Sequence, residues 1–156
     1  MFRLERLHAD HVAPLLAFEL ENRAYFALAI PDRGDEYFRE FGQRLGGLLA
    51  EQDGGVCHFH VVVSGAGEVV GRVNLVDVQD GVAELGYRVG ERWGGQGVAS
   101  WGVGEVCRVA RETYALRGLF AGAAVGNVRS RRVLERNGFV VVRVGDGQVR
   151  YEVALI

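Results

Sequence analysis

The sequence contains no lysine, because all 18 of its basic residues are arginine. This absence excludes any site built on a lysine side chain, such as a Schiff base or the lysine of a P-loop. Cysteine is also scarce. Cys57 and Cys107 lie in apolar runs and have neither the C-x-x-C spacing of a metal site nor the pattern of a disulfide framework. We therefore expect two buried free thiols.

Long apolar runs and a strong net charge are missing as well. No stretch approaches the roughly 18 uninterrupted apolar residues of a membrane-spanning helix, and the first residues lack the apolar segment of a signal peptide. The formal net charge of −2 gives no broad attraction to nucleic acid or to an anionic membrane. We expect a cytoplasmic monomer or homodimer with no nucleic-acid partner and no membrane partner.

The composition that remains is typical of a globular domain. Apolar residues make up 49% of the 156 positions and charged residues 24%, which is enough to bury one sizeable core. No repeat and no shift in composition marks a boundary along the chain. Residues 1–156 are therefore predicted to form a single domain.

Hydrophobic periodicity predicts a mixed α/β (α+β) chain. Alternating or β-branched runs predict strands at 2–7, 56–63, 69–78, 82–89, 119–125, 139–144 and 148–156. Helical spacing predicts helices after an N-cap at Asp10, from about Asp35, over 98–115, and between Asn127 and Asn137-Gly138. Short turns make the strands from 56 to 89 an antiparallel meander, and the helix over 98–115 makes its two flanking strands parallel. We expect a largely antiparallel sheet with a central parallel pair and about four flanking helices.

The strongest functional signal lies between residues 82 and 101. A strand over 82–89 is followed by a glycine-dense turn from Gly90 to Gly97 and by a helix pattern from Val98. Glycines let successive N–H groups point at one spot, and a helix N-terminus adds partial positive charge. This order predicts a phosphate site. The alternative is an ordinary strand-to-helix turn in a chain that has 23 glycines.

A dinucleotide-binding fold would also place glycines between a strand and a helix. Gly95-Gln-Gly97-Val-Ala-Ser100 is one residue short of the G-x-G-x-x-G motif. That motif requires an acidic residue at the end of the next strand to bind ribose, and the strand over 119–125 has none. The motif strand is also expected first in such a domain, whereas here it follows a meander. The sequence disfavours this alternative.

Three segments of the chain carry recognisable motifs. They are Ala83-Glu-Leu-Gly-Tyr-Arg-Val89 followed by Gly95-Gln-Gly-Val-Ala-Ser100, the segment from Asn127 to Phe139 with the pattern N-x-x-S-x-x-V-L-x-x-x-G-F, and Val70 to Leu75. In this order they resemble the central strand with its pyrophosphate loop, the late helix motif and the third strand of the GNAT superfamily of acyl-CoA-dependent N-acetyltransferases, and in particular of its RimJ/RimL-like branch. The resemblance covers nearly the whole chain. It implies a GNAT-type sheet splayed at its central parallel pair, with acetyl-CoA as cosubstrate.

The superfamily loop pattern, Q/R-x-x-G-x-G/A, fits this chain in two registers. One uses Arg92, Gly95 and Gly97, and the other uses Gly94, Gly97 and Ala99. The spacing of the branch selects the second register, which leaves glycine at the Q/R position and makes Arg92 a possible substitute. The cofactor contacts implied by the resemblance are Tyr87, Arg88, Val89, Arg92, Gly95, Gln96, Gly97, Val98, Ala99, Ser100 and Asn127.

The resemblance also implies direct attack by the amine, with no covalent enzyme intermediate. Glu84 is the candidate general base, acting directly or through water. A glutamate on the solvated face of a strand is the structural alternative. Glu19, Glu21 and Asp77 are rival carboxylates. Gly86, a lone glycine in this strand, predicts a local break in strand pairing where the acetyl group would sit.

A proton donor for the departing thiolate is harder to identify. Many superfamily members place a tyrosine seven residues after the motif asparagine, but that position is Leu134 here. The branch carries a serine at the position of Ser130, which could hydrogen-bond the thiolate. The alternative is a helix serine that bonds its own backbone. Asn127 is either a helix cap alone or a cap that also contacts pantetheine.

The acceptor amine remains open at this point. The branch includes enzymes that act on protein N-terminal amines, notably of ribosomal proteins, and others that act on small amines. A GNAT-like module that binds acyl-CoA without turnover is the alternative function. The four histidines, His8, His11, His58 and His60, form no recognisable ligand set, so no metal is expected.

Overall fold

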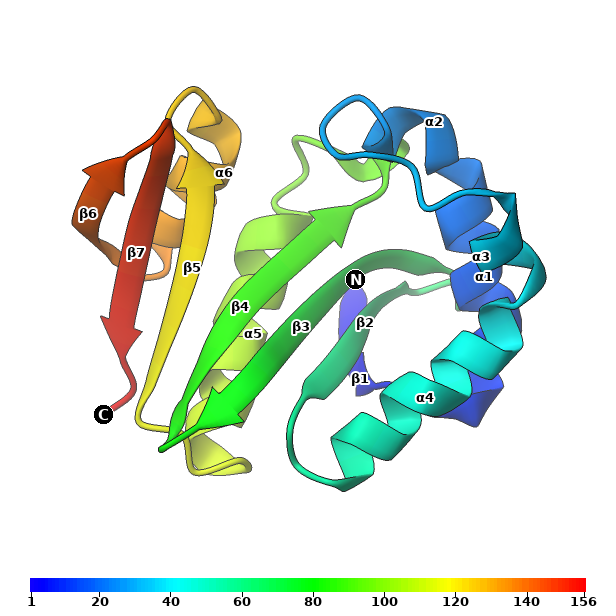
Figure 1. Cartoon of the computed structure of the whole chain (residues 1–156), viewed down its shortest axis with the longest axis horizontal. Helices are drawn as coiled ribbons and strands as arrows, with labels where there is room; N and C mark the ends of the chain where they lie inside the picture. Colours follow the sequence, from blue (N-terminus) through cyan, green and yellow to red (C-terminus); the bar gives the residue numbers. More distant parts are fainter.

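The computed structural model describes residues 1–156, and its centre is one seven-stranded mixed sheet (Figure 1). The strands are β1 (Phe2–Arg6), β2 (His58–Ser64), β3 (Val69–Gln79), β4 (Val82–Val89), β5 (Gly118–Ala124), β6 (Val140–Gly145) and β7 (Gln148–Ala154). They lie in the order β1-β2-β3-β4-β5-β7-β6, antiparallel except at the β4–β5 pair. The predicted fold class is confirmed.

Six α-helices flank the sheet, where the sequence predicted about four. They are α1 (Val12–Glu21), α2 (Arg23–Phe26), α3 (Asp35–Arg39), α4 (Phe41–Asp53), α5 (Val98–Glu112) and α6 (Val128–Arg136). The helix predicted from Asp35 is broken at Glu40, and α2 adds one short turn after α1. No helix has both the length and the apolar character needed to cross a bilayer.

The predicted N-cap at Asp10 is wrong. A 3-10 turn, η1 (Ala9–His11), precedes α1, and its N-cap is His8, whose Nδ1 accepts the Asp10 N–H at 3.2 Å. A histidine ring nitrogen therefore takes the place of the expected carboxylate. The cap predicted at Asn127 is confirmed, because its Oδ1 accepts the Ser130 N–H at the start of α6.

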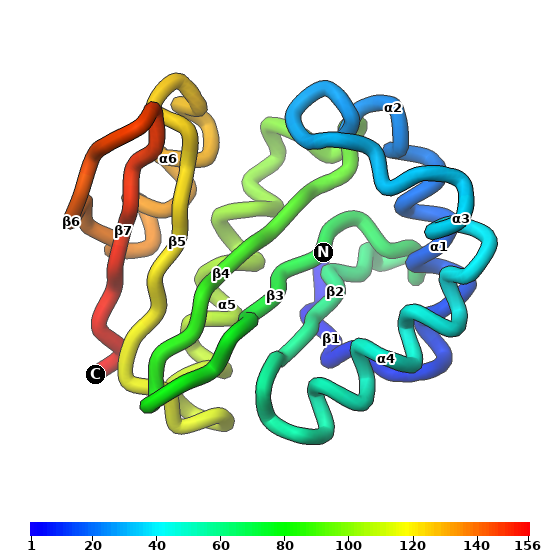
Figure 2. The backbone as a smooth tube through the Cα atoms, viewed as in Figure 1, coloured from blue at the N-terminus to red at the C-terminus, as the bar shows by residue number.

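Each face of the sheet has its own apolar core. Helices α5 and α6 pack on one face, over sheet residues such as Leu75, Leu85 and Leu119. Helices α1 and α4 pack on the other face, but over β2 and β3. Figure 2 shows α1 to α4 gathered on one side of the molecule, so that no helix covers this face of β5, β6 and β7. The site described below opens onto this helix-free face.

The parallel pairing of β4 with β5 is short. It joins Val82–Glu84 to Gly118–Phe120 and stops there. Beyond Glu84, β4 remains paired with β3 as far as Val89, and β5 remains paired with β7 as far as Ala124. The two strands therefore diverge (Figure 1) and leave two backbone edges without strand partners. The predicted break at Gly86 is confirmed on the β5 side, whereas the bulge in the β3–β4 ladder lies in β3, between Val76 and Gln79.

A polar network is buried where β2 meets the end of α5. His60, only 2% exposed, donates from Nδ1 to the Val73 carbonyl at 3.2 Å, so its Nε2 accepts the Tyr114 hydroxyl at 2.6 Å. The His58 ring stacks on Tyr114 with ring centroids 3.7 Å apart. Burial lowers the pKa of His60 to about 4 from its ordinary 6.5, so this ring is neutral at physiological pH.

The neutral state of His60 predicts a loss of stability in mild acid. As pH falls from 6.5 to about 4, the unfolded chain binds a proton at His60 that the folded chain does not, so the free energy of unfolding decreases. The shift corresponds to about 3 kcal/mol. His60→Gln keeps a polar side chain that does not titrate, and its stability should fall less over this window. Urea unfolding at pH 7.5, 6 and 5 measures both slopes, and equal slopes would contradict the assignment.

Candidate functional site

The loop between β4 and α5 presents backbone N–H groups to open space. Gly95 and Gly97 have positive φ angles of 74° and 77°, which glycine adopts without steric cost. Gly97 is the N-cap of α5 and makes no side-chain cap hydrogen bond, so the N–H groups of the first turn have no acceptor within the helix. A Cβ added at Gly95 or Gly97 would meet nothing within 4 Å. A helix N-terminus that has no side-chain cap and has free space beside it can bind an anion through its unpaired N–H groups.

The two glycines with positive φ bear on the register of the loop. Gly95 and Gly97 are the pattern glycines of the first register, whereas Ala99 lies in the first turn of α5 and Gly94 has φ −65°. The backbone geometry therefore gives no independent support to the register with Gly94, Gly97 and Ala99, which stays a prediction. Gln96 holds the loop together by donating to the Arg92 carbonyl at 3.2 Å.

Two arginines predicted as cofactor contacts are engaged elsewhere. The Arg92 guanidinium binds the carboxylates of Glu21, at 2.9 Å, and Glu68. Arg88 donates to Glu19 at 3.1 Å, and its guanidinium lies 4.3 Å from the centre of the Phe26 ring. Both arginines would have to leave these partners to reach a ligand in the loop.

A hydroxyl pair joins β4 to α6 beside the splay. The Tyr87 hydroxyl lies 2.8 Å from Ser130 Oγ. Burial raises the pKa of Tyr87, while its hydrogen bond with Ser130 opposes the rise, so the phenol keeps its proton at neutral pH. Ser130 thus bonds Tyr87 across the fold, in place of the bond to its own helix backbone that was the alternative.

Glu84 lies on the opposite face of β4 from this pair. Ala83 and Leu85 are buried under α5, so alternation along the strand turns Glu84 and Gly86 to the helix-free face. Glu84 forms no hydrogen bond or ion pair with the protein, and it lines an open cavity of about 500 Å³. It stands at the last paired residue before the strands diverge.

The rival carboxylates are in different circumstances. Glu19 is 4% exposed and accepts hydrogen bonds from Arg72, at 3.0 Å, and Arg88. Glu21 is paired with Arg92, and Asp77 lies in the β3 bulge with φ 54°. Of these four carboxylates, Glu84 alone is unpaired at the splay.

Three polar residues at this site had no motif to reveal them. The Asn74 Oδ1 is buried without a hydrogen-bond partner, and Asn74 pairs in register with Gly86. Arg143 and Arg150 line the same cavity as Glu84. The only sequence signal for Asn74 is a polar residue between the apolar Val73 and Leu75, and the two arginines become neighbours only through the pairing of β6 with β7.

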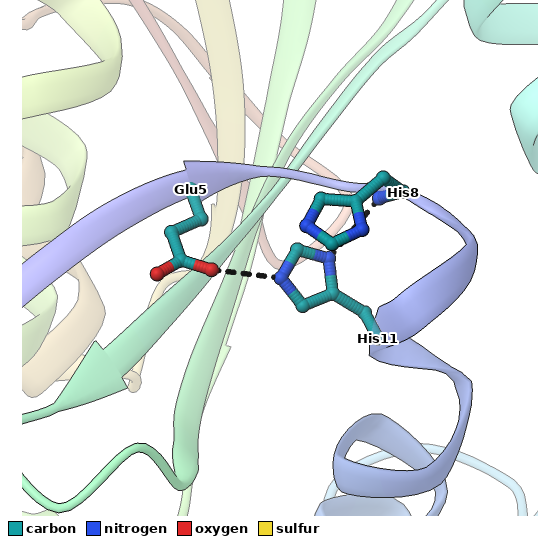
Figure 3. A group of neighbouring side chains, drawn as sticks. All are labelled: Glu5, His8 and His11. Atoms are coloured by element: carbon teal, nitrogen blue, oxygen red, sulfur yellow. Dashed lines mark hydrogen bonds and ion pairs between the residues drawn. The ribbon is translucent and has the colours of Figure 1, made fainter.

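A separate cluster of metal-ligating residue types forms at the N-terminus. Figure 3 shows Glu5, His8 and His11 together, with the His11 Nε2–H donating to Glu5 Oε1 at 2.9 Å. The His8 N–H donates to His11 Nδ1 at 3.1 Å, and His8 Nδ1 likewise accepts a backbone N–H. Since each Nδ1 accepts a hydrogen bond, each ring carries its proton on Nε2. A metal bound at Nε2 would leave the ring proton on Nδ1, and Nδ1 could then no longer accept the backbone N–H. Both backbone hydrogen bonds would be lost, so the cluster is better explained as the cap of η1.

Comparisons with known proteins agree with this geometry. The family described as an acetyltransferase (GNAT) domain matches residues 2–140. No curated protein matches the sequence.

Several solved structures are similar over nearly the whole chain. Ribosomal-protein-S5-alanine acetyltransferase from Vibrio fischeri has a TM-score of 0.89 and 17% identity, covering 99% of this chain and 93% of that chain. RimJ from Mycobacterium smegmatis, in complex with CoA-disulfide, has a TM-score of 0.85 and 20% identity, with coverage of 98% and 81%. Spermidine N-acetyltransferase from Vibrio cholerae, in complex with CoA and spermine, has a TM-score of 0.80 and 17% identity, with coverage of 99% and 95%. At these identities the similarity shows a shared fold.

Proposed function

Because the chain belongs to the GNAT acetyltransferase family, we propose that it transfers an acetyl group from acetyl-CoA to a primary amine, in the first place the N-terminal α-amine of a protein. One observation carries the proposal: the β4 edge without a strand partner leads from the unpaired carboxylate of Glu84 toward the loop at the uncapped start of α5. The similar ribosomal-protein-S5-alanine acetyltransferase structure supports a protein as acceptor. The similar spermidine acetyltransferase supports a small amine as the second possibility.

The residues present fit acetyl-CoA, which supplies an activated acetyl thioester when it binds. The free N–H groups from Gly97 to Ser100 would hold the pyrophosphate without any lysine. The unpaired β4 edge from Gly86 to Val89 would pair with the pantetheine amides as a neighbouring strand does. Asn127, at the start of α6, would contact the same arm. Gly95, Gln96, Val98 and Ala99 would shape the loop around the phosphates.

The reaction requires a deprotonated amine and a protonated thiol product. Glu84 would accept a proton from the ammonium, directly or through water, and general-base help of this kind is worth about 10²–10⁴-fold. The amine nitrogen then bonds to the acetyl carbon as the carbon–sulfur bond breaks. The Tyr87–Ser130 pair would give a proton to the departing sulfur, because the phenol keeps its proton at neutral pH.

An acetyl-CoA turnover screen tests the proposal. The acceptors are peptides with N-terminal alanine or serine, the same peptides with a blocked N-terminus, and spermidine. We expect CoA thiol to be released with the free peptides and not with the blocked ones. CoA binding by calorimetry without release for any amine would favour an acyl-CoA-binding module, and release with spermidine alone would make the acceptor a small amine.

A further inference from the structure

The cavity beside Glu84 has basic residues on its far side. Strands β5, β6 and β7 contribute Phe120, Gly122, Arg143 and Arg150 to its lining. Glu84, on the near side, is unpaired, and Arg143 also forms no ion pair or hydrogen bond with the protein. The cavity therefore presents the free carboxylate of Glu84 facing a pair of guanidinium groups, and Asp146, in the turn between β6 and β7, is the second carboxylate of its lining. This arrangement fits a ligand that carries both a cationic and an anionic group.

The two arginines are direct neighbours in the sheet. Arg143 and Arg150 are register partners across the β6–β7 ladder. Side chains at such positions lie close together on one face, and like charges directly opposite each other are destabilising. Only Arg150 has a carboxylate partner, Glu152, at 3.2 Å and exposed. An anion between the two guanidinium groups would reduce their repulsion and give Arg143 the partner that it lacks in the protein.

An aromatic contact places the Arg150 guanidinium on the strand that neighbours Glu84. This guanidinium lies 4.0 Å from the centre of the Phe120 ring. Phe120 is the register partner of Glu84, and neighbouring strands lie about 5 Å apart, so the guanidinium lies above the strand next to Glu84. Gly122, the register partner of Arg150, has no side chain to fill the space beside the Phe120 ring. A short molecule can therefore reach both charges.

We propose that the acceptor is anionic near its reacting end: an amine with a carboxylate on the same or the next residue, held by Glu84 at the ammonium and by Arg143 and Arg150 at the carboxylate. This inference rests on the proposed function and narrows its substrate class. Either an acidic residue at the start of a peptide or a free amino acid supplies this chemistry. A polyamine offers only cations, which the two arginines repel.

Matched peptides test the acceptor class. The series shares an N-terminal serine and differs at its second residue, which is glutamate, glutamine or lysine. We expect kcat/KM to be about threefold to tenfold higher for the glutamate peptide than for the glutamine peptide, since charge-assisted bonds are strong but Arg143 is exposed and Arg150 only half-buried. The lysine peptide should be the poorest. The α-amides of the single amino acids glutamate and glutamine form a second arm of the experiment, which distinguishes an amino-acid acceptor from a peptide.

Charge reversal assigns the preference to these two residues. Arg143→Glu and Arg150→Glu should each lower the ratio of glutamate-peptide to lysine-peptide kcat/KM, and the double variant should invert it. Arg150→Gln, which removes charge with less disturbance to the hairpin, should give an intermediate ratio. Arg111→Glu is the matched control, because it makes the same change on the exposed surface of α5 and should leave the ratio unchanged.

The outcomes separate this inference from the proposed function. Turnover of all three peptides at equal kcat/KM would overturn the anionic acceptor and leave acetyl transfer standing. Equal ratios in the wild-type and double-variant proteins, with CoA affinity intact, would also overturn it. Absence of turnover with every peptide and amino acid would count against the proposed function itself.

Discussion

Gly97→Asp should weaken CoA binding by about 100-fold or more. The substitution places a carboxylate at the N-cap of α5, where the free N–H groups are expected to hold the pyrophosphate. Two like charges a few ångströms apart at a protein surface repel by up to about 4 kcal/mol, and every 1.4 kcal/mol is a factor of ten in affinity. The carboxylate would also accept the N–H groups of the first turn in place of the phosphate. Calorimetric titration of CoA measures the loss.

Gly97→Asn separates charge from shape. Asparagine and aspartate have nearly the same size, and both tolerate the left-handed backbone that Gly97 adopts at φ 77°. Both also cap helices, so α5 should stay folded in each variant, which circular dichroism checks. We expect the asparagine variant to lose less affinity than the aspartate variant, because its side chain can also accept the N–H groups of the first turn but carries no negative charge. Equal CoA affinities for the two folded variants would contradict an electrostatic phosphate site at this position.

The features that the sequence predicted well are local ones. Strands β3, β4 and β5, the start of α5 and the cap at Asn127 were all placed within about two residues, because alternation, glycine turns and caps act over a few neighbouring positions. The end of the β4–β5 pairing was also predictable, since a lone glycine marked it. The break at Glu40 was not, because apolar spacing continues from α3 into α4 and hides it.

The features that the sequence missed depend on contacts between distant residues. Tyr87 and Ser130 are 43 positions apart, and Glu19 meets Arg72 and Arg88 at separations of 53 and 69. Strand β7 inserts between β5 and β6, which makes it a partner of β5. No local pattern specifies these pairings. They decide which carboxylate is free, which hydroxyls meet, and which arginines face the cavity.

Glu84→Gln should lower turnover most near neutral pH, by about 10- to 100-fold, if Glu84 is the general base. Raising the pH supplies neutral amine without help, so the deficit should shrink there. An N-terminal α-amine has a pKa near 8 and an alkyl amine one near 10. The deficit should therefore close at lower pH for a peptide than for an alkyl amine. Turnover against pH with both acceptors measures this difference.

The Tyr87–Ser130 pair should behave differently from Glu84. Ser130→Ala and Tyr87→Phe each remove one hydroxyl of the 2.8 Å contact and change side-chain size little. If the pair protonates the departing sulfur, each variant should lower turnover by a factor that depends little on the basicity of the acceptor. Unchanged turnover in both variants would remove the pair as the acid.

The pH profile of the Glu84 variant and those of the two hydroxyl variants together test whether the two faces of β4 have separate catalytic roles. Glu84 lies on the helix-free face and the hydroxyl pair on the face of α5, so the amine would enter from one side of the splay and the sulfur would leave on the other. All three substitutions leave the glycine loop intact, and CoA affinity should stay within about twofold of wild type, because none removes a proposed phosphate contact. A Glu84→Gln protein with wild-type rates across the pH range would show that Glu84 is not the general base. Asp77 would then be the next candidate, because Glu19 and Glu21 are already bound to arginines.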